Sequence, residues 1–250
     1  MQHFKKLYLD DNYRNTFSNI QKCLRLNDLD EIGDGTHYLT FNMIGLFSFK
    51  EWSLQQSIDF MWHFLDKIGL IPDYITIHPD KIDEWSSLYT KYHIEIKTDI
   101  ECIWSDGNIS GYCTEFYKND VEIGNIVNTL DQSIDIGFGL ERLLTLLDIQ
   151  ENKSRLDIIE NCTLDLIESG VIPGHNKQGY ILKKLITECI LSGSVIQHDF
   201  FIQLKDNMRL SYFNYLKNKD KKKYQDKNDI FWKDTFGIDV GKIEIYEGLI

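Results

Sequence analysis

The stretch Ser133-Ile134-Asp135-Ile136-Gly137-Phe138-Gly139-Leu140-Glu141-Arg142 decides how this chain folds, because a strand pattern changes there to a helix pattern. We expect strands around 110–117, 121–128 and 133–136, and a helix that begins at Gly139-Leu140. Three successive strands with short connections predict an antiparallel sheet. The last of them leads directly into a helix.

Upstream of this stretch, residues 17–49 have a composition typical of extended structure. The turn-rich segment 27–35 divides them, so the pattern predicts a strand-loop-strand hairpin. Apolar residues recur every three or four positions from Trp52 to Ile68, which predicts an amphipathic helix. Short strands at 74–77 and 93–96 flank a further helix near 80–90.

Downstream of residue 150 the pattern indicates helices only. We expect helices at 155–169 and 179–192, ended by Gly170 and Gly193, and a third from about 199 to 216. Residues 217–229 are polar and are interpreted as a linker or mobile loop, and no element is assigned to the last twenty residues. The prediction is an α+β domain over 1–150 followed by a helical domain over 151–250, without internal repeats.

Composition narrows the class of protein. The chain has 250 residues, a formal net charge of −12 and 42% hydrophobic residues, which excludes disordered and collagen-like proteins. No apolar run approaches the roughly 18 residues of a membrane span, and the N-terminus lacks a secretory signal. We therefore expect a soluble, cytoplasmic protein that makes no membrane contact.

The negative charge is distributed unevenly. Residues 1–150 contain 12 basic and 24 acidic side chains, whereas residues 176–223 contain ten basic and four acidic ones. A locally basic surface of this kind can contact nucleic acid, although a solvated helix face followed by a lysine-rich connector has the same composition. Both interpretations stay open at this point.

Cysteine and histidine spacing gives no support for a metal site. The five cysteines contain no Cys-x-x-Cys pair, and the seven histidines show no His-x-x-x-His spacing. We expect neither a disulfide framework nor a zinc site, and we interpret most of the cysteines as small core residues.

Three stretches together resemble motifs 2 and 3 of the class II aminoacyl-tRNA synthetases, and most of all the alanyl-tRNA synthetase catalytic core. They are Gln21–Arg25 continuing through Asn27-Asp28-Leu29 to His37–Phe49, then Glu122–Val127, then Ser133–Arg142. Gly170-Val171-Ile172-Pro173 and the helix from Gly179 extend the resemblance to about residue 195. It implies the class II antiparallel sheet with flanking helices, followed by a helical region.

The resemblance implies ATP and Mg²⁺ as cofactors and assigns residues to the nucleotide. Arg25 matches the arginine that contacts the α-phosphate, and Arg142 matches the one that holds the γ-phosphate. Met43 is expected to pack against adenine, Glu115 to act near Mg²⁺ or ATP, and Gly139 to keep side chains away from the nucleotide.

The resemblance also implies a small amino acid as substrate, with alanine foremost. Asp135 matches the aspartate that pairs with the α-ammonium, and Asn125 matches an asparagine that holds the same substrate. The resemblance also places Gly137 and Trp104 at this pocket: Gly137, like Gly139, is expected to keep side chains away from the nucleotide, and Trp104 is expected to line the alanine pocket. Taken singly, Arg25 could form a surface salt bridge, Asp135 a strand-end cap and the glycines ordinary turns; their shared order and spacing favour the site.

Departures from the family pattern shape the functional hypotheses. Met1–Lys6 resembles only the trailing end of the family's motif 1, and the loop after Arg25 is shorter than in the family. Asn42 stands where the family has a glutamate, and Ile136 where it has a threonine. The turn Gly174–Gln178 also differs from the family's turn. We expect a truncated homologue without an editing domain. It would transfer the activated amino acid to a tRNA acceptor stem, to a carrier protein or to a small-molecule acceptor; a non-catalytic nucleotide-binding or amino-acid-binding paralogue is a further hypothesis. The oligomeric state stays open.

Overall fold

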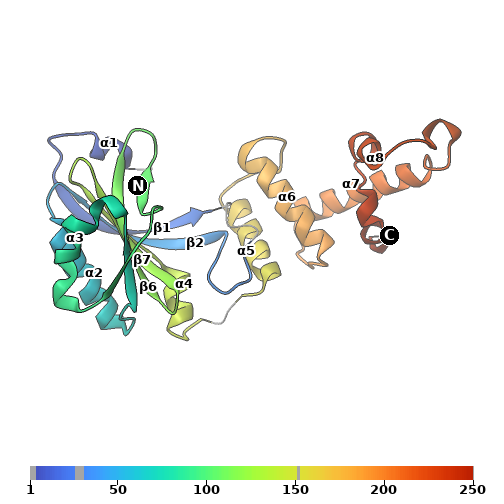
Figure 1. The fold of residues 1–250 in the computed structure, drawn as a ribbon. Helices are drawn as coiled ribbons and strands as arrows, with labels where there is room; N and C mark the ends of the chain where they lie inside the picture. Colours follow the sequence, from blue (N-terminus) through green and yellow to red (C-terminus); the bar gives the residue numbers. More distant parts are fainter. Residues whose placement is uncertain (1–3, 26–30, 151–152, 250) are drawn as a thin grey trace. The chain divides into compact units, whose positions relative to one another are not determined.

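In the computed structural model the chain forms two compact units, Met1–Asn152 and Lys153–Ile250. The structure describes residues 4–25, 31–150 and 153–249. Figure 1 shows a sheet with helices in the first unit and helices in the second. The predicted α+β class is confirmed.

Within the described part of the first unit, eight strands form one sheet. Its order is β1-β2-β8-β7-β6-β3-β4, with β5 paired to β6. The pairs are antiparallel except β3 with β4, which are parallel and joined through a helix. The strands are β1 (Asn15–Leu24), β2 (Thr40–Phe49), β3 (Tyr74–Ile77), β4 (Glu95–Thr98), β5 (Ile103–Ser105), β6 (Ser110–Lys118), β7 (Val121–Thr129) and β8 (Ile134–Gly139).

Two strands differ from the prediction for local reasons. The strand predicted from His93 begins at Glu95, because His93 has a left-handed backbone with φ of 51° and ends a 3₁₀ turn. The three residues of β5 are too few to show a hydrophobic period in the sequence.

Helices α2 (Leu54–Ile68) and α3 (Ile82–Tyr89) cover one face of the sheet (Figure 1). A capping box between Ser53 and Gln56 starts α2, and its apolar positions Ile58, Met61 and Leu65 are fully buried against strand residues such as Phe138. The same core includes Leu143 of α4 (Leu140–Leu146). This packing fixes β8 and the start of α4.

The other face of the sheet is covered only in part. The short helix α1 (Lys5–Tyr8) packs there through an aromatic cluster that includes Tyr8, Phe47 and Phe49. Farther along, this face presents Asn125, Gly137 and Gly139. Because side chains alternate between the faces of a strand, the polar and glycine positions fall opposite the apolar core.

The second unit is helical. Its helices are α5 (Arg155–Glu168), α6 (Lys177–Leu191), α7 (Asp199–Leu216), α8 (Asp229–Phe236) and α9 (Ile243–Gly248). Gly170 and Gly193, with φ of 80° and 81°, follow the ends of α5 and α6 as the sequence predicted. Within 217–229, Tyr224 packs against the rings of Phe231, Trp232 and Phe236. No helix among the described residues combines the length and apolarity that crossing a bilayer requires.

Candidate functional site

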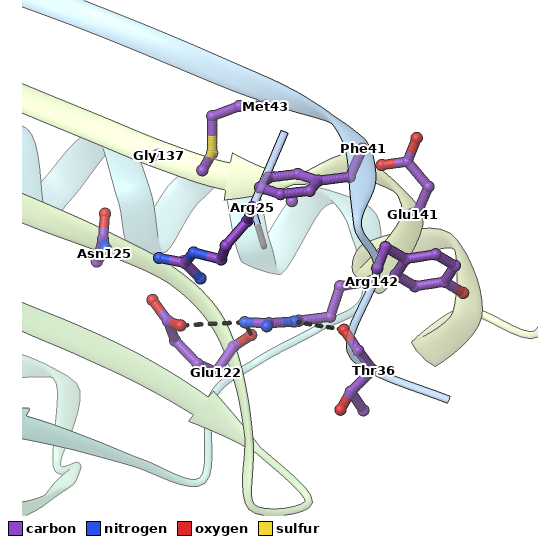
Figure 2. A pocket seen from close by; sticks show the side chains of 12 residues that line it. Arg25, Thr36, Phe41, Met43, Glu122, Asn125, Gly137, Glu141 and Arg142 are labelled. Atoms are coloured by element: carbon purple, nitrogen blue, oxygen red, sulfur yellow. Dashed lines mark hydrogen bonds and ion pairs between the residues drawn. The ribbon is translucent and has the colours of Figure 1, made fainter. Parts of the chain in front are cut away.

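A pocket lies at the β1–β2–β8–β7 part of the open sheet face, where the strands meet the start of α4 (Figure 2). Its empty space of about 560 Å³ is partly open to solvent. Its lining comes from both ends of the first unit's sequence: Arg25, Thr36, Tyr38, Phe41, Met43, Glu122, Gly124, Asn125, Gly137, Gly139, Glu141 and Arg142.

Arg25 enters this pocket from the end of the β1–β2 hairpin. Its backbone N–H donates to the carbonyl of Leu39 at 2.8 Å, so the ladder continues one residue beyond β1. On the partner strand, Phe41 and Met43 lie two residues apart and therefore on one face. In Figure 2 the Arg25 guanidinium extends toward Asn125 and Glu122.

Arg142 enters from the first turn of α4 and is held on two sides. Its Nη1 donates to the Glu122 carboxylate at 3.0 Å and to the Glu122 carbonyl at 2.9 Å, and its Nε donates to the Thr36 carbonyl at 3.4 Å (Figure 2). The side chain is 19% exposed. A second guanidinium therefore stands in the pocket in a defined orientation.

Glu141, the neighbour of Arg142, is bound to the hairpin by Asn42. The Asn42 backbone N–H donates to both carboxylate oxygens, at 2.9 and 3.1 Å, and its side-chain amide donates at 2.8 Å. Charge-assisted hydrogen bonds of this kind are stronger than neutral ones. Asn42 thus joins β2 to α4.

The loop between the hairpin strands supplies Thr36 and Tyr38. Asp34 accepts the backbone N–H groups of Thr36 and His37 at 2.8 and 2.9 Å and also contacts the His37 ring at 2.6 Å. Although burial opposes the shift, these hydrogen bonds hold the pKa of Asp34 well below its usual range. The predicted motif residues Asn27-Asp28-Leu29, like Met1-Gln2-His3, lie outside the described residues.

Gly137 keeps the centre of the pocket open. It pairs with Gly45 on one side and with Asn125 on the other. A β-carbon at Gly137 would stand 3.2 Å from Asn125 Oδ1 and 3.4 Å from Met43 Sδ. A side chain here would push directly against two pocket residues.

Asp135 lies two residues before Gly137 on the same sheet face but outside the pocket lining. It pairs with Phe47 and with Val127. Burial raises the pKa of Asp135 to about 6. A carboxylate in such surroundings is stabilised by a cationic partner.

Glu115 and Trp104 also lie outside the lining. Glu115 is in register with Asn125 on the neighbouring strand, and burial raises its pKa. Trp104 packs against the buried cluster of Cys102, Cys113 and Val127. Of the nine residues predicted from the sequence, six line one pocket: Arg25, Met43, Asn125, Gly137, Gly139 and Arg142.

Six lining residues were not predicted: Thr36, Tyr38, Phe41, Glu122, Gly124 and Glu141. Strand alternation could have identified Phe41, because it lies two positions before Met43. Glu122 and Gly124 belong to the quoted stretch Glu122–Val127. Thr36 and Tyr38 occupy an irregular loop that has no period to reveal them.

A family comparison matches residues 1–125 to the family described as tRNA synthetases class II (A). Three curated relatives are alanine–tRNA ligases. That of Chlamydia trachomatis serovar D is 27% identical across 77% of this chain and 31% of its own length. The ligase of Francisella philomiragia is 28% identical and covers 78% of this chain and 31% of its own length. The ligase of Blochmanniella floridana is 24% identical and covers 87% of this chain and 34% of its own length.

The chain spans about a third of the length of these relatives. A solved structure, the apo histidyl-tRNA synthetase of S. aureus, aligns at a TM-score of 0.38 and 13% identity, covering 82% of this chain and 65% of that one.

Proposed function

We propose, since this chain belongs to the tRNA synthetases of class II (A), that it activates alanine with ATP and transfers the aminoacyl group to tRNA. In the first step a carboxylate oxygen of the amino acid attacks the α-phosphorus. The bond to pyrophosphate breaks, so an aminoacyl-adenylate and pyrophosphate form. The site must therefore stabilise negative charge on the phosphates and hold the ammonium of the amino acid.

The observation that carries the proposal is the convergence of two guanidinium groups on one pocket. Arg25 comes from the hairpin and Arg142 from α4, more than a hundred residues later. Guanidinium groups form paired, charge-assisted hydrogen bonds with phosphate oxygens. In this proposal Arg25 binds the α-phosphate and Arg142 the γ-phosphate.

The pocket fits a nucleotide in its other walls as well. Phe41 and Met43 offer an apolar surface to the base, and the glycines leave room for the sugar and phosphates. Mg²⁺ usually binds to substrate phosphates with one or two carboxylates. Glu122 lines the pocket, and its carboxylate would hold the ion there.

The amino acid would lie beside the nucleotide, along β8. Asp135 would pair with its ammonium, and Asn125 with its polar atoms. One methylene or hydroxyl changes binding by only about 1–3 kcal/mol in an apolar pocket. Glycine and serine are therefore expected to compete with alanine.

The helical unit is the candidate for acceptor binding. Its basic segment includes seven exposed lysines, which suit a phosphate backbone: Lys177, Lys184, Lys217, Lys219, Lys221, Lys222 and Lys223. In the proposal these lysines guide the acceptor stem of the tRNA.

Amino-acid-dependent exchange between ATP and pyrophosphate tests the activation step. The purified chain is assayed with each standard amino acid, and alanine should give the highest rate. Exchange with none of them would overturn the proposal. Exchange without transfer to tRNA would reject the tRNA acceptor and favour a carrier protein or small-molecule amine.

A non-catalytic role would leave binding without exchange. Asparagine at position 42 does not favour such a role, because Asn42 donates hydrogen bonds that hold the Glu141 carboxylate beside the pocket. The pocket arginines are likewise present together.

A further inference from the structure

We propose that Cys102, Cys113 and Glu115 bind one Zn²⁺ ion, at a site separate from the nucleotide pocket. Their sulfur and carboxylate oxygen atoms all lie within 4.8 Å of one another. Zinc binds thiolate sulfur at about 2.3 Å and carboxylate oxygen at about 2.0–2.2 Å, so tetrahedral donors stand about 3.5–3.8 Å apart. Small side-chain rotations would bring the three atoms to that spacing.

The sheet brings the two thiols together, although they are eleven positions apart in the sequence. Ile103 of β5 pairs with Tyr112 of β6, and the backbone N–H of Cys113 donates to the Cys102 carbonyl at 2.9 Å, so Cys102, directly before β5, faces Cys113. Cys102 is fully buried and Cys113 is 5% exposed. Spacing rules based on Cys-x-x-Cys cannot find a site of this kind, because strand pairing brings together ligands that are separated in the sequence.

Glu115 is oriented toward the thiols by its own hydrogen bonds. Its Oε2 accepts the Tyr117 hydroxyl at 2.7 Å and the Thr76 hydroxyl at 3.5 Å, while its Oε1 lies 3.9 Å from Cys113 Sγ. Ligands in zinc sites are commonly held by such outer hydrogen bonds. The Glu115 oxygen that faces the sulfur atoms is thus Oε1, which the two hydroxyl groups do not engage.

The composition of the cluster selects the metal. Two thiolates favour zinc over magnesium or calcium, which prefer oxygen donors. Three protein ligands leave the fourth tetrahedral position to water or to a small molecule. Because Glu115 does not line the nucleotide pocket, this role does not compete with phosphate binding there.

A disulfide between Cys102 and Cys113 is the alternative outcome, and the position of Glu115 argues against it. A disulfide gains no stability from a carboxylate aimed at its sulfur atoms. The Cys113 thiol donates to Glu115 Oε1 at 3.9 Å, a contact that a disulfide could not make.

The test uses the full chain, purified and reduced under anaerobic conditions and freed of metal with a chelator. Cobalt(II) is added first, because its absorption reports thiolate ligands and tetrahedral geometry, and zinc is then added to displace it. We expect one cobalt ion per chain with thiolate-to-cobalt charge transfer that zinc abolishes. Cys102→Ser and Cys113→Ser should lose this band, and Glu115→Gln should bind zinc at least tenfold more weakly.

Cys189→Ser is the matched control, because Cys189 is equally buried but lies in the other unit. It should bind cobalt as the parent does. If the ligand variants fail to fold, zinc protection of the parent against alkylation replaces them: zinc should protect Cys102 and Cys113 but not Cys23. Reduced parent protein that binds no cobalt, or zinc that protects neither thiol, would overturn the site.

Discussion

Arg142 and Glu122 form an ion pair of 3.0 Å inside the pocket, and the Glu122 carbonyl accepts a second hydrogen bond from the same guanidinium nitrogen. The pair holds Arg142 in place before any ligand arrives. Because Arg142 is mostly buried, it would meet a phosphate with little loss of side-chain entropy.

Arg142→Ala is the first prediction. Each charged hydrogen bond contributes about 1.5–3 kcal/mol, so the exchange rate should fall about tenfold or more. Arg14→Ala, at an exposed position whose side chain donates to the carbonyls of Asp11 and Tyr13, should exchange at the parent rate. The double variant Arg142→Ala/Glu122→Gln separates the roles: if it regained parent activity, Arg142 would serve only to pair Glu122.

The second prediction concerns pH and Asp135. A carboxyl group with a pKa of about 6 is ionised above that pH and protonated below it, so kcat/KM for alanine should fall as the pH drops through 6. Asp135→Asn should lower kcat/KM about 30-fold or more at pH 7.5, since losing a buried charged partner costs about 2 kcal/mol or more.

The pH profile of Asp135→Asn should also lose the step near 6, whereas Asp11→Asn, at an exposed position, should keep it. The effect of Asp135 on the free energy of unfolding has the opposite pH dependence. The pKa of Asp135 rises from 3.8 to about 6 on folding, so its contribution to stability falls as the pH rises between these values. An unchanged step in Asp135→Asn would contradict the assignment.

Gly137→Ala is the third prediction. The added methyl group would stand 3.2 Å from Asn125 Oδ1 and 3.4 Å from Met43 Sδ, so we expect KM for alanine or ATP to rise about tenfold while the thermal midpoint changes little. Gly248→Ala, where nothing lies within 4 Å, is the control. Equal KM values for Gly137→Ala and the parent would show that substrates do not approach β8 here.

The fourth prediction, Asn42→Asp, tests the hydrogen bonds between Asn42 of β2 and Glu141 of α4. The new carboxylate would face Glu141 and remove the amide hydrogen bond of 2.8 Å, at a cost of about 1.5–3 kcal/mol. The midpoint of thermal unfolding should fall by about 3–10 °C. Asn12→Asp adds the same charge at an exposed position; if the two variants unfold at the same temperature, these hydrogen bonds contribute nothing.

The fifth prediction concerns the basic segment. Changing Lys221, Lys222 and Lys223 to glutamate should weaken tRNA binding and reduce the slope of log affinity against log salt by about one for each phosphate that is no longer bound. Exchange between ATP and pyrophosphate should stay at the parent rate, because these exposed lysines lie in the second unit. Unchanged salt dependence would place the acceptor elsewhere.

The sequence predicted the regular helices and strands well, because an element with one buried face and one open face repeats its apolar residues at a fixed spacing. The alternation in β2 and β8 and the three-and-four spacing in α2 each correspond to one observed element. Arg25, Met43 and Arg142 could be assigned because they lie within or beside such elements.

What the sequence could not reveal depends on interactions between distant segments. Thr36 enters the pocket through a loop built by side-chain hydrogen bonds to Asp34, which follow no period. The meeting of Cys102 with Cys113 depends on the register of β5 with β6. The hydrogen bond of Asn42 to Glu141 joins residues 99 positions apart.

The hydrogen bond from Arg142 Nε to the Thr36 carbonyl connects the pocket to the loop between β1 and β2, so a change at Arg142 would affect this loop. A phosphate bound to Arg142 would restrain this guanidinium further, and the restraint would reach the Thr36 and His37 amides that Asp34 holds. Deuterium uptake at Thr36 and His37 should therefore fall if a nucleotide binds to Arg142 as proposed.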